Sequence, residues 1–303
     1  MILVGPTAIG KTDLAITIAQ QLGKEIISAD SRQVYTHMDI GTAKPSAEQV
    51  AAVPHHFISI KTPDEYYSAG QYATEARQVI AELIAAGSPP VVVGGSGLYI
   101  RALVDGFFEP KIADAEVKKR LQASIDENGL APLYARLQKI DPATAQRLQA
   151  TDKQRILRAL EVYEITERPF SEFQQMQNCP ADFQTSFVGL TMDRQKLYRR
   201  IEKRVDQMLE DGLLQEVQLL LEMGYTPHLN ALKTVGYQEA FAYLENKISL
   251  DEMTRMIKQK SRNYAKRQYT WFRKDKRIHW IDLDEVTELE DRVAEVVRLM
   301  HTE

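Results

Sequence analysis

The chain has 303 residues, of which 44% are hydrophobic and 26% are charged, and its formal net charge is −4. This composition is typical of a folded globular protein, and the length suffices for one large domain or two ordinary ones. The single cysteine, Cys179, excludes an internal disulfide and a cysteine-rich zinc site. No stretch approaches the ~18 apolar residues of a membrane span and no export signal precedes the first motif, so we expect a cytoplasmic protein with no membrane partner.

The first part of the chain, to about residue 110, alternates short apolar runs with helical patterns. This alternation is typical of an α/β domain built on a parallel sheet. The predicted strands are 2–4, 25–29, 57–60 and 90–93, and the predicted helices are 13–22 and 71–86. The run of β-branched residues in the last of these strands favours an interior position in the sheet.

The middle of the chain, from about Asp114, is predicted to be helical. Asp114 is a candidate N-cap for a helix that ends at Gly129, because apolar residues recur every four positions between them. Further helices are expected to begin at Asp141 and at Thr151 or Asp152. We find no convincing strand pattern before residue 187, which indicates a helical insertion.

The last third returns to the sheet and is then mostly helical. Strands are predicted at 187–191 and 278–283, and helices at 194–223, with a break at Gly212, and at 249–274. We therefore predict an α/β fold in which a P-loop NTPase-like parallel sheet core carries a helical insertion and a helical C-terminal region. The predicted parts are residues 1–112 for the first part of the core, 113–186 for the insertion, and 187–303 for the return to the core with basic C-terminal helices.

The most specific motif reads GPTAIGKT and matches every fixed position of the P-loop pattern. Backbone N–H groups of such a loop bind phosphate oxygens, and its glycines allow the tight backbone path. Lys11 would supply a cation to the phosphates, and Thr12 would place its hydroxyl on Mg²⁺. The predicted diphosphate-binding residues are Gly5, Pro6, Thr7, Ala8, Ile9, Gly10, Lys11 and Thr12.

Two further segments follow predicted strands, and parallel strands bring their carboxyl ends to one edge of the sheet. Asp30 follows the second strand directly, so we expect it near the P-loop, as a general base, as a ligand of Mg²⁺ through water, or as a plain helix cap. The strand at 90–93 ends in Gly94, Gly95 and Ser96, without the acidic residue that many P-loop ATPases have there. These glycines allow a ligand to approach the backbone closely, although a tight turn into a helix explains them as well.

Positive charge is concentrated on three predicted helix faces of this acidic chain. The largest face comprises Arg255, Lys258, Arg262, Lys266 and Arg273; the second lies between Arg194 and Arg204; the third comprises Arg155 and Arg158. One basic helix face is usually just solvated, but three on a chain of net charge −4 indicate a polyanionic partner. RNA is such a partner, and proteins that recognise RNA often bind loops with unstacked bases.

Together these motifs resemble those of the tRNA dimethylallyltransferases, also called tRNA isopentenyltransferases. The matching segments are 5–12, 30–35, 39–45, 94–99, 152–161, 235–237 and 265–273. They run through nearly the whole chain in the order of the family, which makes the resemblance specific. Eukaryotic members often add a C-terminal zinc finger, which one cysteine cannot build, so the resemblance is to the bacterial type.

The resemblance implies transfer of the dimethylallyl group from dimethylallyl diphosphate to the exocyclic amine of the adenosine 3′ to the anticodon in tRNA, with release of diphosphate. It further implies that the P-loop binds the donor with Mg²⁺, that Asp30 is the base for the amine proton, and that Ser96 lies near the reacting adenine. The implied catalytic residues are Asp30, Ser96, Lys11 and Arg204. The positions that match tRNA-contacting ones are Asp30, Ser31, Arg32, Gln33, Lys118, Gln154, Arg155, Arg158, Lys233, Gly236, Lys266, Arg267 and Arg273.

The expected partners are dimethylallyl diphosphate and the anticodon stem-loop of tRNA, and we expect a monomer. Three other functions fit part of the motifs. A P-loop small-molecule kinase would share the loop, the sheet and Mg²⁺, but would consume ATP and would not need the basic helices. An adenylate prenyltransferase would act on a free nucleotide, and a non-catalytic RNA-binding protein would need only the basic faces.

Overall fold

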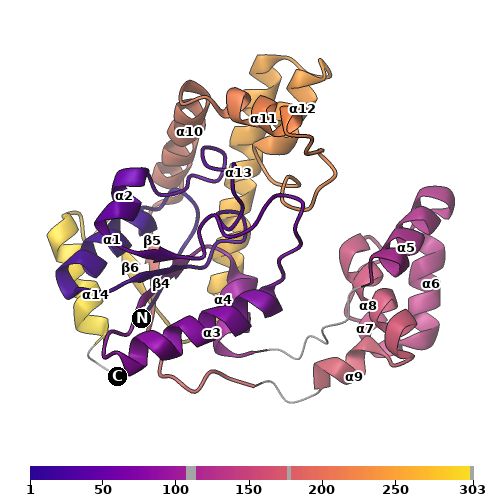
Figure 1. Ribbon diagram of the computed structural model, residues 1–303, viewed down its shortest axis with the longest axis horizontal. Coiled ribbons are helices and arrows are strands. Elements are labelled where there is room, and N and C mark those ends of the chain that lie inside the picture. Colours follow the sequence, from indigo (N-terminus) through magenta and orange to yellow (C-terminus); the bar gives the residue numbers. More distant parts are fainter. Residues whose placement is uncertain (107–113, 176–178, 301–303) are drawn as a thin grey trace. The chain divides into compact units, whose positions relative to one another are not determined.

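The computed structural model describes residues 1–106, 114–175 and 179–300. It divides the chain into two compact units, Met1–Val104 with Ala181–Glu303, and Asp105–Pro180 (Figure 1). The second unit comes from the middle of the sequence, so the chain leaves the first unit once and returns to it. The sequence predicted residues 113–186 for this insertion, so both predicted boundaries lie C-terminal to those of the second unit, by eight and six residues.

The first unit is built on a six-stranded sheet in which every pairing of neighbouring strands is parallel. Its order is β3-β2-β4-β1-β5-β6. The strands are β1 (Ile2–Val4), β2 (Ile26–Ser28), β3 (His55–His56), β4 (Val91–Gly94), β5 (Phe187–Thr191) and β6 (Ile278–Asp282). Because all strands point the same way, the chain leaves β1, β2 and β4 at one edge of the sheet, where ligands of open α/β sheets bind.

Helices of the first unit pack on this sheet or on one another. They are α1 (Lys11–Leu22), α2 (Ala47–Ala52), α3 (Ala69–Ala85), α4 (Gly97–Val104), α10 (Arg194–Glu210), α11 (Leu213–Glu222), α12 (Tyr237–Leu244), α13 (Leu250–Phe272) and α14 (Leu289–Met300). One buried apolar cluster joins the central strands to α1, α10, α13 and α14. Helices α3 and α4 pack against each other, and α10 packs against α13 (Figure 1). These contacts place α10 and α13 beside the P-loop that follows β1.

The second unit is helical throughout its described residues and has its own apolar core. Its helices are α5 (Ala115–Asn128), α6 (Ala131–Ile140), α7 (Pro142–Ala145), α8 (Lys153–Thr166) and α9 (Phe170–Gln175). The core is formed by Leu121, Leu133, Leu137, Ile156 and Leu160, which are nearly or fully buried. The side chain of Asp114 caps α5, as expected. This unit therefore buries enough apolar surface to pack as a compact helical body.

Most predicted elements agree with the structure to within a few residues, but the strand predicted at 57–60 is wrong. Phe57 and Ser59 have φ angles of 64° and 52°, in the left-handed region that an extended strand cannot use. The strand lies earlier, at His55–His56, and pairs with β2. Helices α2, α4, α6, α9, α12 and α14 are not among the predicted elements. None of the described helices is both long and apolar enough to cross a membrane.

Candidate active site

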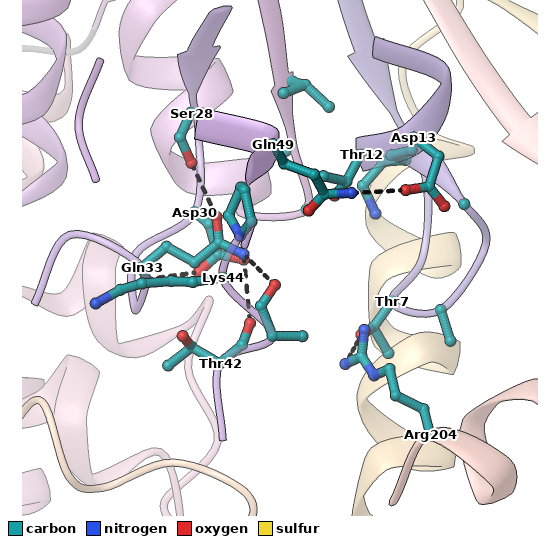
Figure 2. Close-up of a pocket in the computed structure, with 18 of the residues that line it drawn as sticks. Thr7, Thr12, Asp13, Ser28, Asp30, Gln33, Thr42, Lys44, Gln49 and Arg204 are labelled. Carbon is teal, nitrogen blue, oxygen red and sulfur yellow. Dashed lines mark hydrogen bonds between the residues drawn. The ribbon is translucent and has the colours of Figure 1, made fainter. Parts of the chain in front are cut away.

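The P-loop connects β1 to α1 and lines a cavity of about 480 Å³ (Figure 2). Gly10 is the N-cap of α1 and has a φ of 101°, which only glycine adopts without strain. The ammonium group of Lys11 donates to the carbonyls of Gly5 and Pro6 at 3.0 and 2.8 Å. The loop residues that face the cavity are Thr7, Ala8, Gly10, Lys11 and Thr12. Gly5, Pro6 and Ile9 are buried and support the loop from behind.

Asp30 lies at the carboxyl end of β2 and lines the same cavity as Lys11. Its Oδ1 accepts hydrogen bonds from the backbone N–H groups of Arg32 and Gln33, at 2.8 and 3.4 Å. Asp30 therefore does cap the turn that follows β2. Within the described residues its second oxygen, Oδ2, has no hydrogen-bond partner, so one oxygen fixes the side chain and the other is left to accept a proton or bind a ligand.

Arg204 reaches the P-loop from α10, and its guanidinium donates to the hydroxyl of Thr7 at 2.6 Å (Figure 2). Burial lowers the pKa of Arg204, while the charge of Asp30 opposes that effect. Burial also lowers the pKa of Lys11 to about 7; Asp30 raises it and Arg204 lowers it further. The cavity thus contains two desolvated cationic side chains, and an anion bound there would stabilise the charged form of both.

Ser96 joins the turn after β4 to the turn after β2. Its hydroxyl accepts from the backbone N–H of Ser31 at 2.9 Å and donates to the Ser31 hydroxyl at 3.2 Å. At the two preceding glycines, neighbouring protein atoms occupy the space that a side chain would need. A Cβ on Gly94 would lie 2.2 Å from the carbonyl oxygen of Ala29, and one on Gly95 would lie 2.2 Å from the side chain of Gln268. Close packing of the turn is therefore sufficient to explain both glycines.

A second cavity, of about 510 Å³, shares Thr7, Asp30, Thr42, Arg204 and Tyr264 with the first. Its further basic residues are Arg32, Lys233, Lys260 and Arg267, and its apolar ones include Ile201, Val205, Met208 and Ile257. Burial raises the pKa of the Tyr264 phenol, and the charge of Asp30 raises it further. The two cavities thus meet at Asp30, Arg204 and Tyr264, so two ligands could approach one another there.

Of the residues expected to contact tRNA, Gln33 lines the first cavity, and the others fall into three structural groups. Ser31, Arg32, Lys233, Gly236 and Arg267 line the second cavity with Asp30. Lys266 and Arg273 are exposed on α13, outside both cavities, and the guanidinium of Arg273 lies over the Tyr269 ring. Lys118, Gln154, Arg155 and Arg158 belong to the second unit, where Arg158 is paired with Glu161 at 3.0 Å.

Several of these positions have polar groups engaged within the protein. Besides the Arg158 pair, the guanidinium of Arg32 donates to the carbonyl of Asn230 at 2.7 Å. The side-chain amide of Gln33 donates to the carbonyls of Thr42 and Ala43 and accepts from Ser28 (Figure 2). The N–H of Gly236 donates to Glu239 at 2.7 Å. Gln33 therefore shapes the wall of the first cavity, and Gly236 begins helix α12.

The long cationic face predicted for the helix after Ser249 is interrupted. Lys258 pairs with Asp206 at 2.6 Å, and Arg262 pairs with Glu202 at 2.5 Å. Both carboxylates lie on α10, about fifty to sixty residues earlier in the chain, so the sequence pattern of α13 alone gave no sign of them. The prediction of one continuous stripe is wrong. Arg255 and Lys260 are exposed as well but pair with Glu252 and Glu239. Among the described residues, the exposed cations of α13 that pair with no carboxylate are Lys266 and Arg267, toward its C-terminal end.

Two structural residues of the site were missed by sequence reasoning. Glu216 on α11 accepts from the backbone N–H groups of Asp39, Ile40 and Gly41, at 2.7, 2.7 and 3.0 Å, and from the hydroxyl of Tyr237 at 2.6 Å. It thereby fixes the loop whose next residues line the first cavity. The other is Gln268 on α13, which bonds to the P-loop. Neither carries a local signal, because their partners, which are backbone groups apart from the Tyr237 hydroxyl, lie far away in the sequence.

The first cavity suits a Mg²⁺ ion that arrives with a diphosphate. Across the described residues, no three His, Cys, Asp or Glu side chains gather in a way that could hold a metal by themselves. Mg²⁺ usually retains waters and binds through one or two protein oxygens together with substrate phosphates. Thr12 and Asp30 both line the cavity and offer such oxygens.

Comparisons with known proteins identify the family. The family model described as IPP transferase matches residues 33–275. A tRNA dimethylallyltransferase of Symbiobacterium thermophilum is 46% identical, over 99% of this chain and 94% of that protein, and one of Pelotomaculum thermopropionicum is 43% identical, over 98% and 95%.

Solved structures show the same similarity. The tRNA isopentenylpyrophosphate transferase of Bacillus halodurans has a TM-score of 0.72 and 38% identity, covering 99% of this chain and 94% of that one. A eukaryotic dimethylallyltransferase acting on tRNA has a TM-score of 0.80 and 28% identity, covering 98% and 76%. The chain therefore belongs to the IPP transferase family.

Proposed function

We propose that this protein transfers the dimethylallyl group of dimethylallyl diphosphate to the exocyclic amine of the adenosine 3′ to the anticodon in tRNA. The observation that carries the proposal is the junction of the two cavities at Asp30 and Arg204. The first cavity has a P-loop for a diphosphate, and the second is lined by basic and apolar residues that suit a nucleotide. Asp30 borders both, at the place where donor and acceptor would meet.

In the first cavity, Lys11, Arg204 and the loop N–H groups would bind the donor's diphosphate. The bond between the allylic carbon and its oxygen breaks, and the electron pair leaves with the diphosphate. Cations already fixed around that oxygen stabilise the negative charge that develops, without any need to reorganise water. Because the pKa of Lys11 is lowered, part of the free protein has a neutral amine there, and binding of the anion would favour its protonation.

On the acceptor side, the adenine amine forms the new bond to the allylic carbon and loses a proton. The free Oδ2 of Asp30 would take that proton, provided that the amine lies within about 2.6–3.2 Å of it. The hydroxyl of Ser96 holds the turn next to Asp30 through Ser31, which positions the base. The adenosine must leave its stack to enter the cavity. Enzymes that modify a base commonly extrude it from the stack in this way.

Mg²⁺ would be held by the Thr12 hydroxyl together with oxygens of the bound diphosphate. When bound, it would supply further positive charge to the leaving group. Lys11 and Arg204 would bind the diphosphate oxygens that the Mg²⁺ does not.

The RNA would be the anticodon stem-loop, held in part by Arg32, Lys233 and Arg267 at the second cavity. We assign Lys118, Gln154, Arg155 and Arg158 of the helical unit to further contacts with the same RNA, and Lys266 and Arg273 to its phosphates. The enzyme would act as a monomer in the cytoplasm, where tRNA is modified.

Purified protein, labelled dimethylallyl diphosphate and Mg²⁺ test this proposal. Unmodified tRNA, the same tRNA with guanosine in place of the target adenosine, and free AMP are the alternative acceptors. Label in the unmodified tRNA alone supports the proposal. Label in AMP would indicate an adenylate prenyltransferase, transfer of phosphate from ATP would indicate a kinase, and tRNA binding with no transfer would indicate a binding protein.

A further inference from the structure

Gln268 is a buried polar residue on a helix whose neighbouring residues are charged and exposed. It lies on α13 directly after Lys266 and Arg267, and its exposure is 6%. Its side-chain oxygen accepts from the backbone N–H of Thr7 at 2.8 Å, and its side-chain nitrogen donates to the carbonyl of Gly95 at 3.0 Å. One amide thus joins α13 to the P-loop and to the turn after β4.

The two contacts explain why a glutamine is present. The P-loop offers a donor and the turn offers an acceptor, so the connecting group must accept on one side and donate on the other, as an amide does. Glutamate of the same length accepts but cannot donate when ionised, and leucine can do neither. Gly95 leaves room for this amide, because a Cβ there would lie 2.2 Å from its nitrogen.

The partners of Gln268 belong to two different loops that line the first cavity. Thr7 lines both cavities, and its hydroxyl is held by Arg204. Gly95 precedes Ser96, which is bonded to Ser31 beside Asp30. Gln268 consequently fixes the distance between the loop that binds the diphosphate and the turn that supports the proposed base.

Helix α13 also carries groups that face the proposed RNA. Arg267 lines the second cavity, and Lys266 is exposed beside it. An RNA that binds these side chains would restrain the segment from which Gln268 reaches the P-loop. The buried amide of Gln268 would transmit this restraint, since a shift of the helix would strain or break its two hydrogen bonds, and a buried polar group left without a partner is costly.

We propose that Gln268 is a positioning residue that couples tRNA binding on α13 to diphosphate binding in the P-loop. The inference rests on the proposed function for the identity of the two ligands. Coupling of this kind is reciprocal, so each ligand would tighten the binding of the other by the same factor. Without Gln268, both ligands would still bind, but independently.

The test measures the Kd of inorganic pyrophosphate with Mg²⁺, with and without saturating unmodified tRNA. Four proteins are compared: the natural one, Gln268→Leu, Gln268→Glu and the control Gln259→Leu, which makes the same change at an exposed position of α13. Pyrophosphate cannot prenylate the RNA, so the measurement is at equilibrium. Gln268→Glu keeps an acceptor for the Thr7 N–H and gives a second measurement should the leucine variant fail to fold.

We expect tRNA to tighten pyrophosphate binding in the natural protein and in Gln259→Leu. In the Gln268 variants we expect pyrophosphate to bind about tenfold more weakly, the effect of losing one or two hydrogen bonds, and tRNA to have no further effect. The affinity for tRNA alone should stay within about twofold, because the exposed cations are retained.

Retention of the full tRNA effect in either Gln268 variant overturns the inference, as does a natural protein in which tRNA leaves the Kd of pyrophosphate unchanged. These results are separable from a failure of the proposed function. If the natural protein prenylates tRNA but shows no coupling through Gln268, only this inference falls. If it does not prenylate tRNA at all, the proposed function falls first.

Discussion

The affinity for the donor should depend on pH through Lys11. Burial lowers the pKa of this side chain to about 7 in the free protein, so at higher pH a growing fraction of the molecules has a neutral amine there. A bound diphosphate favours the charged ammonium and raises its pKa. The direction follows: above pH 7 the protein must take up a proton to bind, so binding weakens as the pH rises.

The size of the effect follows from the fraction of charged Lys11. With a free pKa of about 7, the charged fraction in the free protein falls from about one half at pH 7 to about one hundredth at pH 9, while the bound diphosphate keeps Lys11 charged over the whole range. The Kd should then rise about 50-fold, which corresponds to about 2.3 kcal/mol. The donor's own last ionisation, near pH 6 for a phosphate group, is largely complete over this range and does not mask the change.

Titration calorimetry with dimethylallyl diphosphate and Mg²⁺ at pH 7, 8 and 9 measures this change, and buffers of different ionisation enthalpy report the proton uptake. The control is Lys11→Arg, which stays charged over the whole range and should lose the slope even if it binds more weakly. An affinity that does not change with pH in the natural protein, or the same slope in Lys11→Arg, would refute the reasoning.

Three further outcomes are expected. Glu216→Gln keeps the shape but removes the charge that accepts three backbone N–H groups, so the unfolding free energy in urea should fall by about 1–3 kcal/mol, and an unchanged midpoint would contradict this role. Gly10→Ala forces a Cβ onto a residue with φ of 101° and should destabilise the fold by about 1–2 kcal/mol while weakening donor binding; equal stability and affinity would show that the loop relaxes freely. Arg267→Ala should weaken binding of different tRNAs alike and reduce the slope of log Kd against log salt by about 1, whereas an unchanged slope would exclude a phosphate contact.

The sequence predicted the site's framework because that framework is local. The P-loop is a continuous motif between an apolar run and an amphipathic helix, and Asp30 directly follows a strand. Parallel strands end at one edge, so both were expected to meet there, and the structure places them in one cavity. The strand order and the cavity walls depend on long-range packing, which no such pattern encodes.

The failures have the same origin. Phe57 and Ser59 are apolar and small residues in a run that looks extended, but both have positive φ angles. They make contacts far away in the sequence, because the Ser59 N–H donates to the Gln33 carbonyl at 2.9 Å and the Phe57 ring packs edge-on against Tyr72. The cations of α13 were read as one stripe because Glu202 and Asp206, which neutralise two of them, come from another helix. Gln268 gave no signal in the sequence, since its backbone partners are more than 170 positions away.

The central claim is that Asp30 takes the proton of the adenosine amine at the junction of the two cavities. Single-turnover transfer from labelled dimethylallyl diphosphate to tRNA, compared between the natural protein and Asp30→Asn at saturating concentrations of both substrates, tests it most directly. We expect the rate to fall by about 10²–10⁴-fold, with the Kd of tRNA and of the donor each within about threefold of the natural values. A rate that stays within a few-fold, or a loss that disappears once weaker substrate binding is overcome, would contradict it.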